Sequence, residues 1–424
     1  MTYDQALEFI HGIARFGTKP GLRRVELLCE RIGNPQKKLK FIHVAGTNGK
    51  GSACTMLSRV LAQAGYKTGL YISPFVLDFK ERIQINNEMI EPEELVKSTV
   101  LVKSHWDVLD KQGDTPSEFE TLVAIAFDYF LRMKVDVVVL EVGMGGRLDA
   151  TNVIDTPLVS VITSLGMDHM EYLGNTIGAI AFEKCGIIKP GGVTVCYPEQ
   201  EPEAMEVIRK RCSEENNPLF LPKQPIVLGM DFLGTRMEYG GLELTVPLIG
   251  AHQVKNACTA LATLSALKDR GFPVSDEDIV QGIAQTSFPA RLEVISREPL
   301  IVLDGAHNQD GAEVLGKALD MLAGKKIHAV MGMLSNKDGA GILREILPRC
   351  NTLTTVSISD NPLAMPAEEL AERAKPFCGE IHVASSPREG VASAFARCGP
   401  DDVLLVCGSL YLASELRPEL FKLG

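Results

Sequence analysis

A glycine-rich turn between an apolar strand and a helical stretch constrains this chain more than any other feature. The strand covers residues 41–44, the turn reads Gly46-Thr-Asn-Gly-Lys-Gly-Ser52, and helical sequence continues from Ala53 to Ala64. In such a turn, backbone N–H groups and a helix N-terminus face an anion, the lysine reaches the outer phosphates, and a hydroxyl can serve Mg²⁺. The turn therefore predicts a phosphate-binding loop, in a variant form because a glycine separates the lysine from the hydroxyl residue.

Composition excludes several kinds of partner. The net charge is −11 over 424 residues, and no cluster of basic residues offsets it, which argues against a nucleic-acid partner. The chain shows no basic start followed by an apolar stretch, and no apolar run approaches the ~20 residues of a membrane span. The ten cysteines are scattered without Cys-x-x-Cys pairs, which fits thiols in a reducing compartment. We therefore expect a cytoplasmic protein with no nucleic-acid or membrane partner.

Strand-like apolar runs alternate with amphipathic helical stretches, which predicts a mostly parallel α/β sheet covered by helices. From Phe220 to Val246 the pattern changes, and Gly240-Gly241 between two short runs predicts a hairpin, followed by a helix over His252–Arg270. The strands predicted before this region are Phe41–Val44, Thr68–Tyr71, Val135–Leu140, Leu158–Thr163 and Val193–Tyr197.

A second, smaller α/β domain is predicted after a connector. The segment Thr286–Glu293 contains Pro289, which interrupts helical continuity. We therefore divide the chain into residues 1–290 and residues 291–424. The strands predicted in the second part are Leu300–Leu303, Ile327–Met331, Thr354–Ser357, Glu380–Val383 and Val403–Val406.

Polar residues follow two of the predicted strands in the first domain. Glu141 ends the strand that begins at Val135, and we interpret it as a ligand of the Mg²⁺ that accompanies a phosphate loop. His169 follows the next strand behind Asp168, which leaves open a metal-binding role and a purely structural one. Lys184, taken by itself, is typical of a lysine on a helix surface.

Asp304 and His307 follow an apolar strand in the second domain. Their residue types suit nucleotide contacts or proton transfer, and a structural role stays equally open. The sequence has no His-Glu-x-x-His motif, no Gly-x-Ser-x-Gly with an obvious partner, and no Gly-x-Gly-x-x-Gly after a strand. Metalloprotease, serine hydrolase and dinucleotide oxidoreductase functions are therefore disfavoured.

Together these segments resemble the Mur ligase superfamily and, within it, the folylpolyglutamate synthases and bifunctional dihydrofolate/folylpolyglutamate synthases. The resemblance spans nearly the whole chain and implies a P-loop-containing, Mur ligase-like N-terminal domain with a mostly parallel sheet, plus a smaller α/β C-terminal domain. The matching segments are Gly46–Ser52, Ser73–Phe75, Glu81–Ile83, Glu141–Asn152, Asp168–His169, Glu183–Pro190, His252–Asn256, Arg291–Glu293, Asp304–Asn308 and Gly408–Leu412.

The resemblance implies a role for each candidate residue. Ser73, Glu141 and His169 would bind Mg²⁺. Lys184 would be carbamylated and help hold a second Mg²⁺, which reverses the interpretation of this lysine by itself. The catalytic candidates would be Lys50, Lys184, Asp304 and His307, and His307 would lie in the interdomain cleft. The ATP-binding residues would be Asn48, Gly49, Lys50, Gly51, Ser52, Asn256, Arg291 and Asp304. The pterin end of the substrate would lie near Ser117, Glu118, Phe119, Glu120, Leu148, Asp149 and Ala150.

Three positions depart from the family pattern. Cys185 stands where Ala is common and Ala290 where Gly often precedes the arginine, and we expect both changes to be silent. Phe75 stands where bifunctional members often have His, which favours the polyglutamylating subclass. Whether dihydropteroate is also accepted stays open.

The reaction that the resemblance implies is ATP-dependent amide formation with L-glutamate. The substrate carboxylate of folate, or of dihydropteroate, attacks the γ-phosphate and gives an acyl phosphate, which the glutamate amine then attacks. The alternatives are a Mur-type ligase acting on a cell-wall nucleotide and a binding module that hydrolyses ATP slowly. We expect a monomer.

Overall fold

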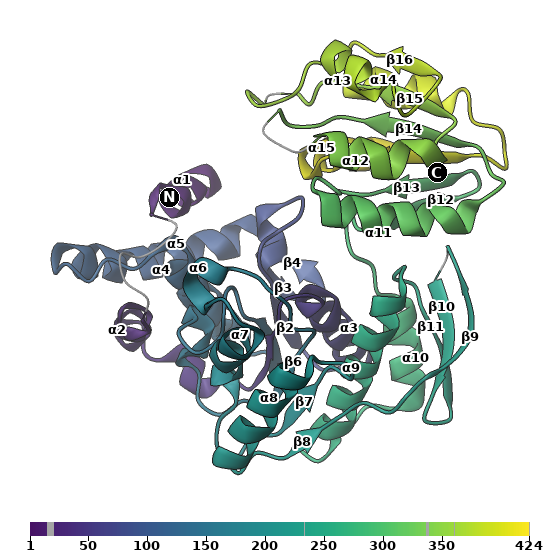
Figure 1. Cartoon of the computed structure of the whole chain (residues 1–424). Helices are drawn as coiled ribbons and strands as arrows, with labels where there is room; N and C mark the ends of the chain where they lie inside the picture. The colour runs from purple at the N-terminus through teal and green to yellow at the C-terminus, as the bar shows by residue number, and fades with distance from the viewer. Residues whose placement is uncertain (15–20, 233, 336–338, 360, 424) are drawn as a thin grey trace.

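Two α/β units make up the chain in the computed structural model, which describes residues 1–14, 21–232, 234–335, 339–359 and 361–423 (Figure 1). The first unit, coloured purple to green, carries an eight-stranded sheet and a separate three-stranded sheet among the described residues. The second, coloured green to yellow, carries a six-stranded sheet. Within the described residues, no helix is both long and apolar enough to cross a membrane.

The large sheet is parallel from β2 to β8, and β3 and β4 extend it in antiparallel pairing. Parallel pairing brings the carboxyl ends of β2, β5, β1 and β6 to one edge, where a ligand site in this architecture forms. In spatial order the strands are β4 (Glu88–Met89), β3 (Ile83–Ile85), β2 (Thr68–Tyr71), β5 (Val137–Glu141), β1 (Phe41–Ala45), β6 (Val159–Ile162), β7 (Thr194–Cys196) and β8 (Leu219–Phe220).

Both faces of this sheet are buried, because the central strands β1 and β5 are largely apolar and are buried at every position. Ile42 and Val44 of β1 pack under one layer of helices, whereas Phe41 packs under the other. The first layer comprises α3 (Lys50–Gln63), α9 (Ala251–Lys268) and α10 (Asp276–Ala284). The second comprises α1 (Tyr3–Gly12), α2 (Arg23–Arg31), α4 (Pro92–Lys111), α5 (Glu118–Arg132), α7 (Ile177–Lys184) and α8 (Pro202–Glu214), and the short α6 (Met170–Leu173) precedes α7.

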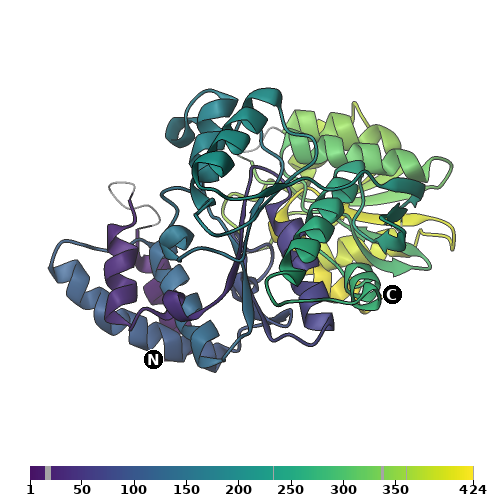
Figure 2. The ribbon, with the colours of Figure 1, turned by 90° about the horizontal axis from the view of Figure 1, so that it is seen from below.

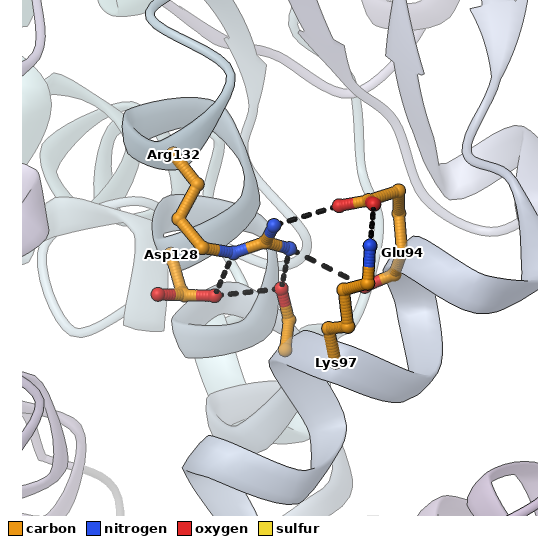
Figure 3. A network of polar contacts seen from close by, with 5 residues as sticks. Glu94, Lys97, Asp128 and Arg132 are labelled. Carbon is orange, nitrogen blue, oxygen red and sulfur yellow. Dashed lines mark hydrogen bonds and ion pairs between the residues drawn. The ribbon is translucent and has the colours of Figure 1, made fainter.

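A polar network fixes α5 against α4 (Figure 3). Arg132 contacts the carboxylates of Glu94 and Asp128, at 2.6 and 3.0 Å, and the hydroxyl of Ser98, at 2.8 Å. Lys97 also pairs with Glu94. Ser98 in turn donates to Asp128, so that the charges of both acids are compensated within the helix pair. This network is structural, and it sets the position of the helix that begins next to Ser117.

A small antiparallel sheet follows the large one and contains the predicted hairpin. Tyr239 pairs with Leu242 across Gly240 and Gly241, both of which have positive φ. Positive φ at both central residues is the geometry of a tight hairpin turn. The strands are β9 (Ile226–Asp231), β10 (Gly234–Tyr239) and β11 (Leu242–Val246).

The second unit is a parallel sheet with one antiparallel edge strand. Its spatial order is β12 (Glu293–Arg297), β13 (Leu300–Leu303), β17 (Val403–Cys407), β14 (Ile327–Met331), β15 (Thr352–Thr355) and β16 (Ile381–Val383). Its helices are α11 (Gln309–Leu319), α12 (Gly339–Ile346), α13 (Ala367–Ala374), α14 (Pro387–Phe395) and α15 (Leu410–Leu420). Figure 2 shows this unit beside the helices that cover one face of the first sheet.

The predicted strands are all present, with ends within about two residues of the predicted ones. Two details differ. Helix α3 begins at Lys50 rather than Ala53, because Gly49 takes a left-handed conformation and starts the helix directly after it. Strand β12 lies in a segment without an apolar run, since it is a half-exposed edge strand that pairs only with β13.

Candidate active site

The phosphate loop is held by bonds to the neighbouring strand end. The amides of Thr47 and Asn48 both donate to the carbonyl of Ser164, at 2.8 and 3.1 Å. Gly49 has a φ of 82°, and a Cβ there would lie 2.3 Å from Oδ1 of Asn256 on α9. The backbone amides at the N-terminus of α3 have no intrahelical partner, so they can bind an anion. The amide of Asn48 is already bonded within the loop, so a contact of this residue with ATP, which stays a prediction, would involve its side chain.

A glycine is also required where the loop leaves β1. A Cβ on Gly46 would lie 1.8 Å from Oγ1 of Thr163, so any side chain must displace the loop. We expect Gly46→Ala to raise the dissociation constant for ADP by roughly tenfold or more, since overpacking costs about 1–3 kcal/mol. Calorimetric titration with ADP measures this, and Thr163→Ala added to the variant should restore part of the affinity. Gly229→Ala, which meets open space, is the matched control; an unchanged affinity of Gly46→Ala would contradict the assignment of the loop.

Two lysines converge on one carbonyl of the loop. The ammonium group of Lys50 donates to the carbonyls of Gly46 and Thr47, at 3.0 and 3.1 Å. Lys184, 2% exposed at the end of α7, donates to the same Gly46 oxygen at 2.8 Å. Burial, together with the charge of Lys50, lowers the pKa of Lys184 to about 8. Lys184 is thus a buried active-site group, and the interpretation of this residue as a surface lysine is wrong.

Glycine in the segment after β5 allows this helix end to approach. A Cβ on Gly146 would lie 2.8 Å from the carbonyl oxygens of both Glu183 and Lys184. The Arg147 amide donates to Glu183 O at 2.7 Å, and its guanidinium pairs with the Glu183 carboxylate at 2.9 Å. The backbone that carries Lys184 is therefore clamped against the glycine-rich segment.

The three predicted metal ligands are only partly assembled. Glu141, buried at the end of β5, accepts a hydrogen bond from the Ser73 amide at 3.0 Å, and burial raises its pKa. His169 has a φ of 47°, is 51% exposed, and lies 3.7 Å from the carboxylate of Asp168. Across the described ranges, no three His, Cys, Asp or Glu side chains group closely enough to hold a metal ion. The structure therefore brings Ser73 and Glu141 together and leaves His169 on the exposed loop.

The donor chemistry nevertheless suits Mg²⁺. A carboxylate offers about four acceptor positions, and the Glu141 carboxylate shares this edge of the sheet with the hydroxyl-bearing Ser73 and Ser52. The Glu141 Oε2 atom lies 4.0 Å from the position of a Cβ on Gly51. Oxygen donors and the phosphate-binding end of α3 thus adjoin each other.

The unusual glycine of the loop has a steric explanation. A Cβ on Gly51 would lie 3.0 Å from the ring of Phe288, which comes from the connector between the two units. The guanidinium of Arg291 lies 4.8 Å from the centre of the same ring. Its positive charge partly offsets the rise in the pKa of Glu141 that burial causes. Gly51 therefore lets the connector pack on the phosphate loop. Sequence reasoning missed Phe288, although an aromatic residue within a polar connector was an available signal.

Asp304 holds the connector to the second unit. Its two carboxylate oxygens accept hydrogen bonds from the amides of Leu292, at 2.7 Å, and Ala306, at 2.8 Å. Burial raises its pKa to about 6. His307 bonds through Nδ1 to the carbonyl of Gly305 at 2.9 Å, which places the lone pair on Nε2 in the neutral ring. Asp304 therefore lies close enough to Arg291 for the guanidinium charge to act on it, and it also has a structural role because it fixes the connector.

The substitution at Ala290 is not silent. Ala290 has a φ of 51°, in the left-handed region, and its carbonyl accepts a 2.7 Å hydrogen bond from Gly305. This conformation costs an L-residue roughly 1–2 kcal/mol that glycine avoids. Cys185, by contrast, is a buried thiol in an apolar cluster, as a small residue at this position should be.

The two predicted pterin segments lie together, with different roles for their members. The ring of Phe119 packs on Gly143, where a Cβ would lie 2.4 Å from it, and the Asp149 carboxylate accepts from the Met144 amide at 2.9 Å. Ala150 is buried and Leu148 is 37% exposed. Residues of both segments thus reach the same glycine-rich stretch.

Two members of the first segment are occupied elsewhere. Glu120 forms a capping box with Ser117 at the start of α5 and pairs with Arg24 at 2.9 Å. Glu118 lies 3.4 Å from His11. The polar groups of Ser117 and Glu120 thus already fix the helix end, and their predicted contact with the substrate stays a prediction.

A buried chain of hydrogen bonds supports Asp149. Thr151 donates to Asp149 at 2.5 Å, and His43 of β1 bonds to the same hydroxyl at 2.8 Å. Complete burial lowers the pKa of His43 to about 3, so the ring is neutral. Sequence reasoning missed both residues, because nothing in a strand interior marks a histidine as a support for a carboxylate 106 positions away.

Comparison with known proteins assigns the chain. The family model for the Mur ligase middle domain matches residues 44–264, and that for the Mur ligase glutamate ligase domain matches residues 290–410. A dihydrofolate synthase/folylpolyglutamate synthase of Bacillus subtilis is 35% identical over 99% of both chains. The chain belongs to this family of Mur-type ligases. It is accordingly an ATP-dependent ligase with the two-domain Mur ligase architecture.

Solved structures agree with the assignment. The folylpolyglutamate synthase of Thermotoga maritima superposes with a TM-score of 0.88 at 33% identity, covering 100% of this chain and 97% of that one. That of Mycobacterium tuberculosis, complexed with ADP and AMPPCP, gives 0.79 at 30% identity, covering 99% and 98%. The family assignment confirms the fold class predicted from the sequence.

Proposed function

We propose that this ligase adds L-glutamate to the γ-carboxylate of a (tetrahydro)folate through an acyl phosphate. The observation that carries the proposal is the convergence of Lys50 and Lys184 on the loop, beside the buried carboxylate of Glu141. Such a site joins cationic and metal-binding groups at one helix N-terminus, which suits the meeting of a carboxylate with a polyphosphate. Two activities, folylpolyglutamate synthase and dihydrofolate synthase, appear in the name of the Bacillus subtilis relative.

In the first step the substrate carboxylate attacks the γ-phosphorus of ATP, and ADP leaves. In the second, the amine of glutamate attacks the acyl carbon, and phosphate leaves as the amide forms. Lys50 and the amides that open α3 offset the negative charge that develops on the phosphoryl oxygens. The carboxylate alone is a poor acyl donor, so phosphorylation supplies the leaving group.

Ser73, Glu141 and His169 are the residues we assign to Mg²⁺, and a carbamate on Lys184 would contribute to a second ion. Bound Mg²⁺ supplies charge neutralisation at the phosphates. Because His169 lies on an exposed loop at 51% exposure, this assignment requires the loop to turn inward when nucleotide binds.

The second domain completes the site in this proposal, with the division placed after residue 290. Asn256 and Arg291 would contact the nucleotide, and Arg291 already acts electrostatically on Glu141. Asp304 would hold the connector, and His307 would present Nε2 to the cleft. Closure of the domains would exclude water from the acyl phosphate.

The pteroyl group would lie at the glycine-rich stretch, against Phe119, Leu148, Asp149 and Ala150. Asp149 is a fixed acceptor there, held by Thr151 and the Met144 amide. A pterin offers N–H donors that match a buried carboxylate. Dihydrofolate synthase activity on dihydropteroate would use the same pocket.

An assay of ADP release tests the function. We expect release that depends on both glutamate and tetrahydrofolate, with a separate measurement on dihydropteroate. Release with a cell-wall nucleotide instead, or release indifferent to glutamate, would support the alternatives named above and overturn the proposal.

The ten cysteines are all free thiols, which supports a cytoplasmic location. Gel filtration tests the expectation of a monomer.

A further inference from the structure

A cavity of about 420 Å³ lies between the two domains. Its walls come from α3, from β2 and the hairpin that follows it, from the connector at residues 287–289, and from α15. Ser414 of α15 donates to the Leu77 carbonyl at 3.3 Å, so that a direct contact between the domains borders the cavity. The phosphate loop itself and Lys50 do not line it.

The acidic side chains of this cavity are already satisfied. Glu81 accepts hydrogen bonds from the amides of Val76, Leu77 and Asp78, at 2.7, 3.0 and 3.0 Å. Asp78 caps the turn that follows, through the amide of Lys80 at 2.9 Å. Neither carboxylate therefore needs a cationic ligand.

One of the two cations is also satisfied. Arg417 forms a bidentate pair with Glu293, with distances of 2.7 to 3.1 Å. Arg59 of α3 differs, because within the described part of the chain no carboxylate lies within salt-bridge distance of it. The negative charge of Glu88 acts on the Arg59 guanidinium only at longer range, where it raises the pKa of Arg59. The cavity thus contains one guanidinium without a counter-ion.

The missing counter-ion is energetically unfavourable because the guanidinium of Arg59 is partly buried. Its Nε atom is buried and has no hydrogen-bond partner among the described residues, and burial lowers the pKa of the guanidinium. Buried donors normally have a hydrogen-bond partner, because a donor without one has lost its bonds to water. Asn87, in the turn of the β3–β4 hairpin, adds a buried side-chain oxygen that also has no partner in this region.

The rest of the wall is apolar. Leu70 and Ile72 line it from β2 and its end, Met89 from β4, and Phe288 from the connector. We propose that this cavity binds a small organic anion, with its carboxylate on Arg59, its apolar body on these four side chains, and a polar substituent within reach of Asn87.

The phosphate loop does not line this site, and the proposal does not rest on the proposed function. Its occupant would contact α3, which carries the phosphate loop at its other end, and α15 of the second domain. A ligand that contacts both domains stabilises the arrangement in which both contacts exist. The site is therefore placed to bias domain movement.

Binding of 3-phenylpropionate, measured by calorimetry on the full chain with and without ADP, tests the proposal. We expect saturable binding with a dissociation constant on the order of millimolar, as for a fragment of this size, and no competition by ADP. Arg59→Gln should weaken binding about tenfold, because it removes the charge-assisted bond. The neutral analogue 3-phenylpropionamide should bind more weakly by a similar factor.

Two further variants keep the result interpretable. Arg236→Gln, at an exposed arginine of β10, is the matched control and should change nothing. Asn87→Gly suits the φ of 64° at this position, keeps the turn, and should weaken binding severalfold if Arg59→Gln does not fold. Equal affinity of wild type and Arg59→Gln, equal affinity for the amide, or no saturation would each overturn the proposal.

Discussion

Replacing Lys50 by alanine should lower glutamate-dependent ADP release by about 10²–10³-fold or more while the fold persists. The ammonium group of Lys50 is the cation at the first turn of α3, where it bonds to the loop carbonyls of Gly46 and Thr47. When a nucleotide binds, the same flexible side chain can turn to the outer phosphates. The expected loss falls on kcat, because charge on the transferred phosphoryl group is greatest during transfer.

The measurement is steady-state ADP release at saturating folate and glutamate, with circular dichroism to check the fold. Lys210→Ala, at an exposed lysine of α8, serves as the matched control and should keep full activity. Turnover of Lys50→Ala equal to that of the control would remove the basis for assigning this loop to catalysis.

Much of the fold can be predicted because its central strands are apolar on both faces. Continuous apolar runs such as residues 137–140 and Val403–Cys407 identify buried parallel strands without any further information. The edges are different. Strand β12 is half-exposed over most of its length and depends on pairing with β13, so its own residues carry little signal.

The site residues likewise divide into those that the sequence predicts and those whose surroundings only the folded chain shows. Strand ends predict Glu141 and the phosphate loop, since polar groups at the carboxyl edge of a parallel sheet have a known place. The environment of Lys184 depends on a contact 138 positions away, and that of Gly51 on Phe288 of the connector. A motif can name such residues by resemblance, but only the folded chain shows that Lys184 is buried, or that Glu120 is held by Arg24.

Lys184→Ala should lose about 10²-fold or more of its activity, and added formate or acetate should restore part of it. The reason lies in the charges around the loop. Two ammonium groups that share the Gly46 carbonyl repel each other, whereas a carbamate on Lys184 would turn this repulsion into attraction to Lys50. A small carboxylic acid can occupy the space left by the truncated side chain and supply the missing negative charge.

The lowered pKa makes the modification feasible. Carbon dioxide reacts with the neutral amine, and a pKa of about 8 leaves roughly one Lys184 in ten neutral at pH 7, against fewer than one in a thousand for an ordinary lysine. The neutral fraction rises with pH through 8. After removal of carbon dioxide, activity should therefore return faster at pH 8 than at pH 6.5 when the same concentration of carbon dioxide is restored.

Labelled bicarbonate separates modification from a simple structural role. A carbamate on Lys184 should give a ¹³C signal in wild type that is absent from Lys184→Met, a variant that fills the buried space without an amine. Lys189→Met is the matched control, since Lys189 is a half-buried lysine whose pKa is also lowered by burial, and it bonds to the carbonyls of Asn152 and Ile154 instead of the loop. Full activity of Lys184→Ala without added acid would refute the carbamate, because the loop would then work without the anion that the site is inferred to require.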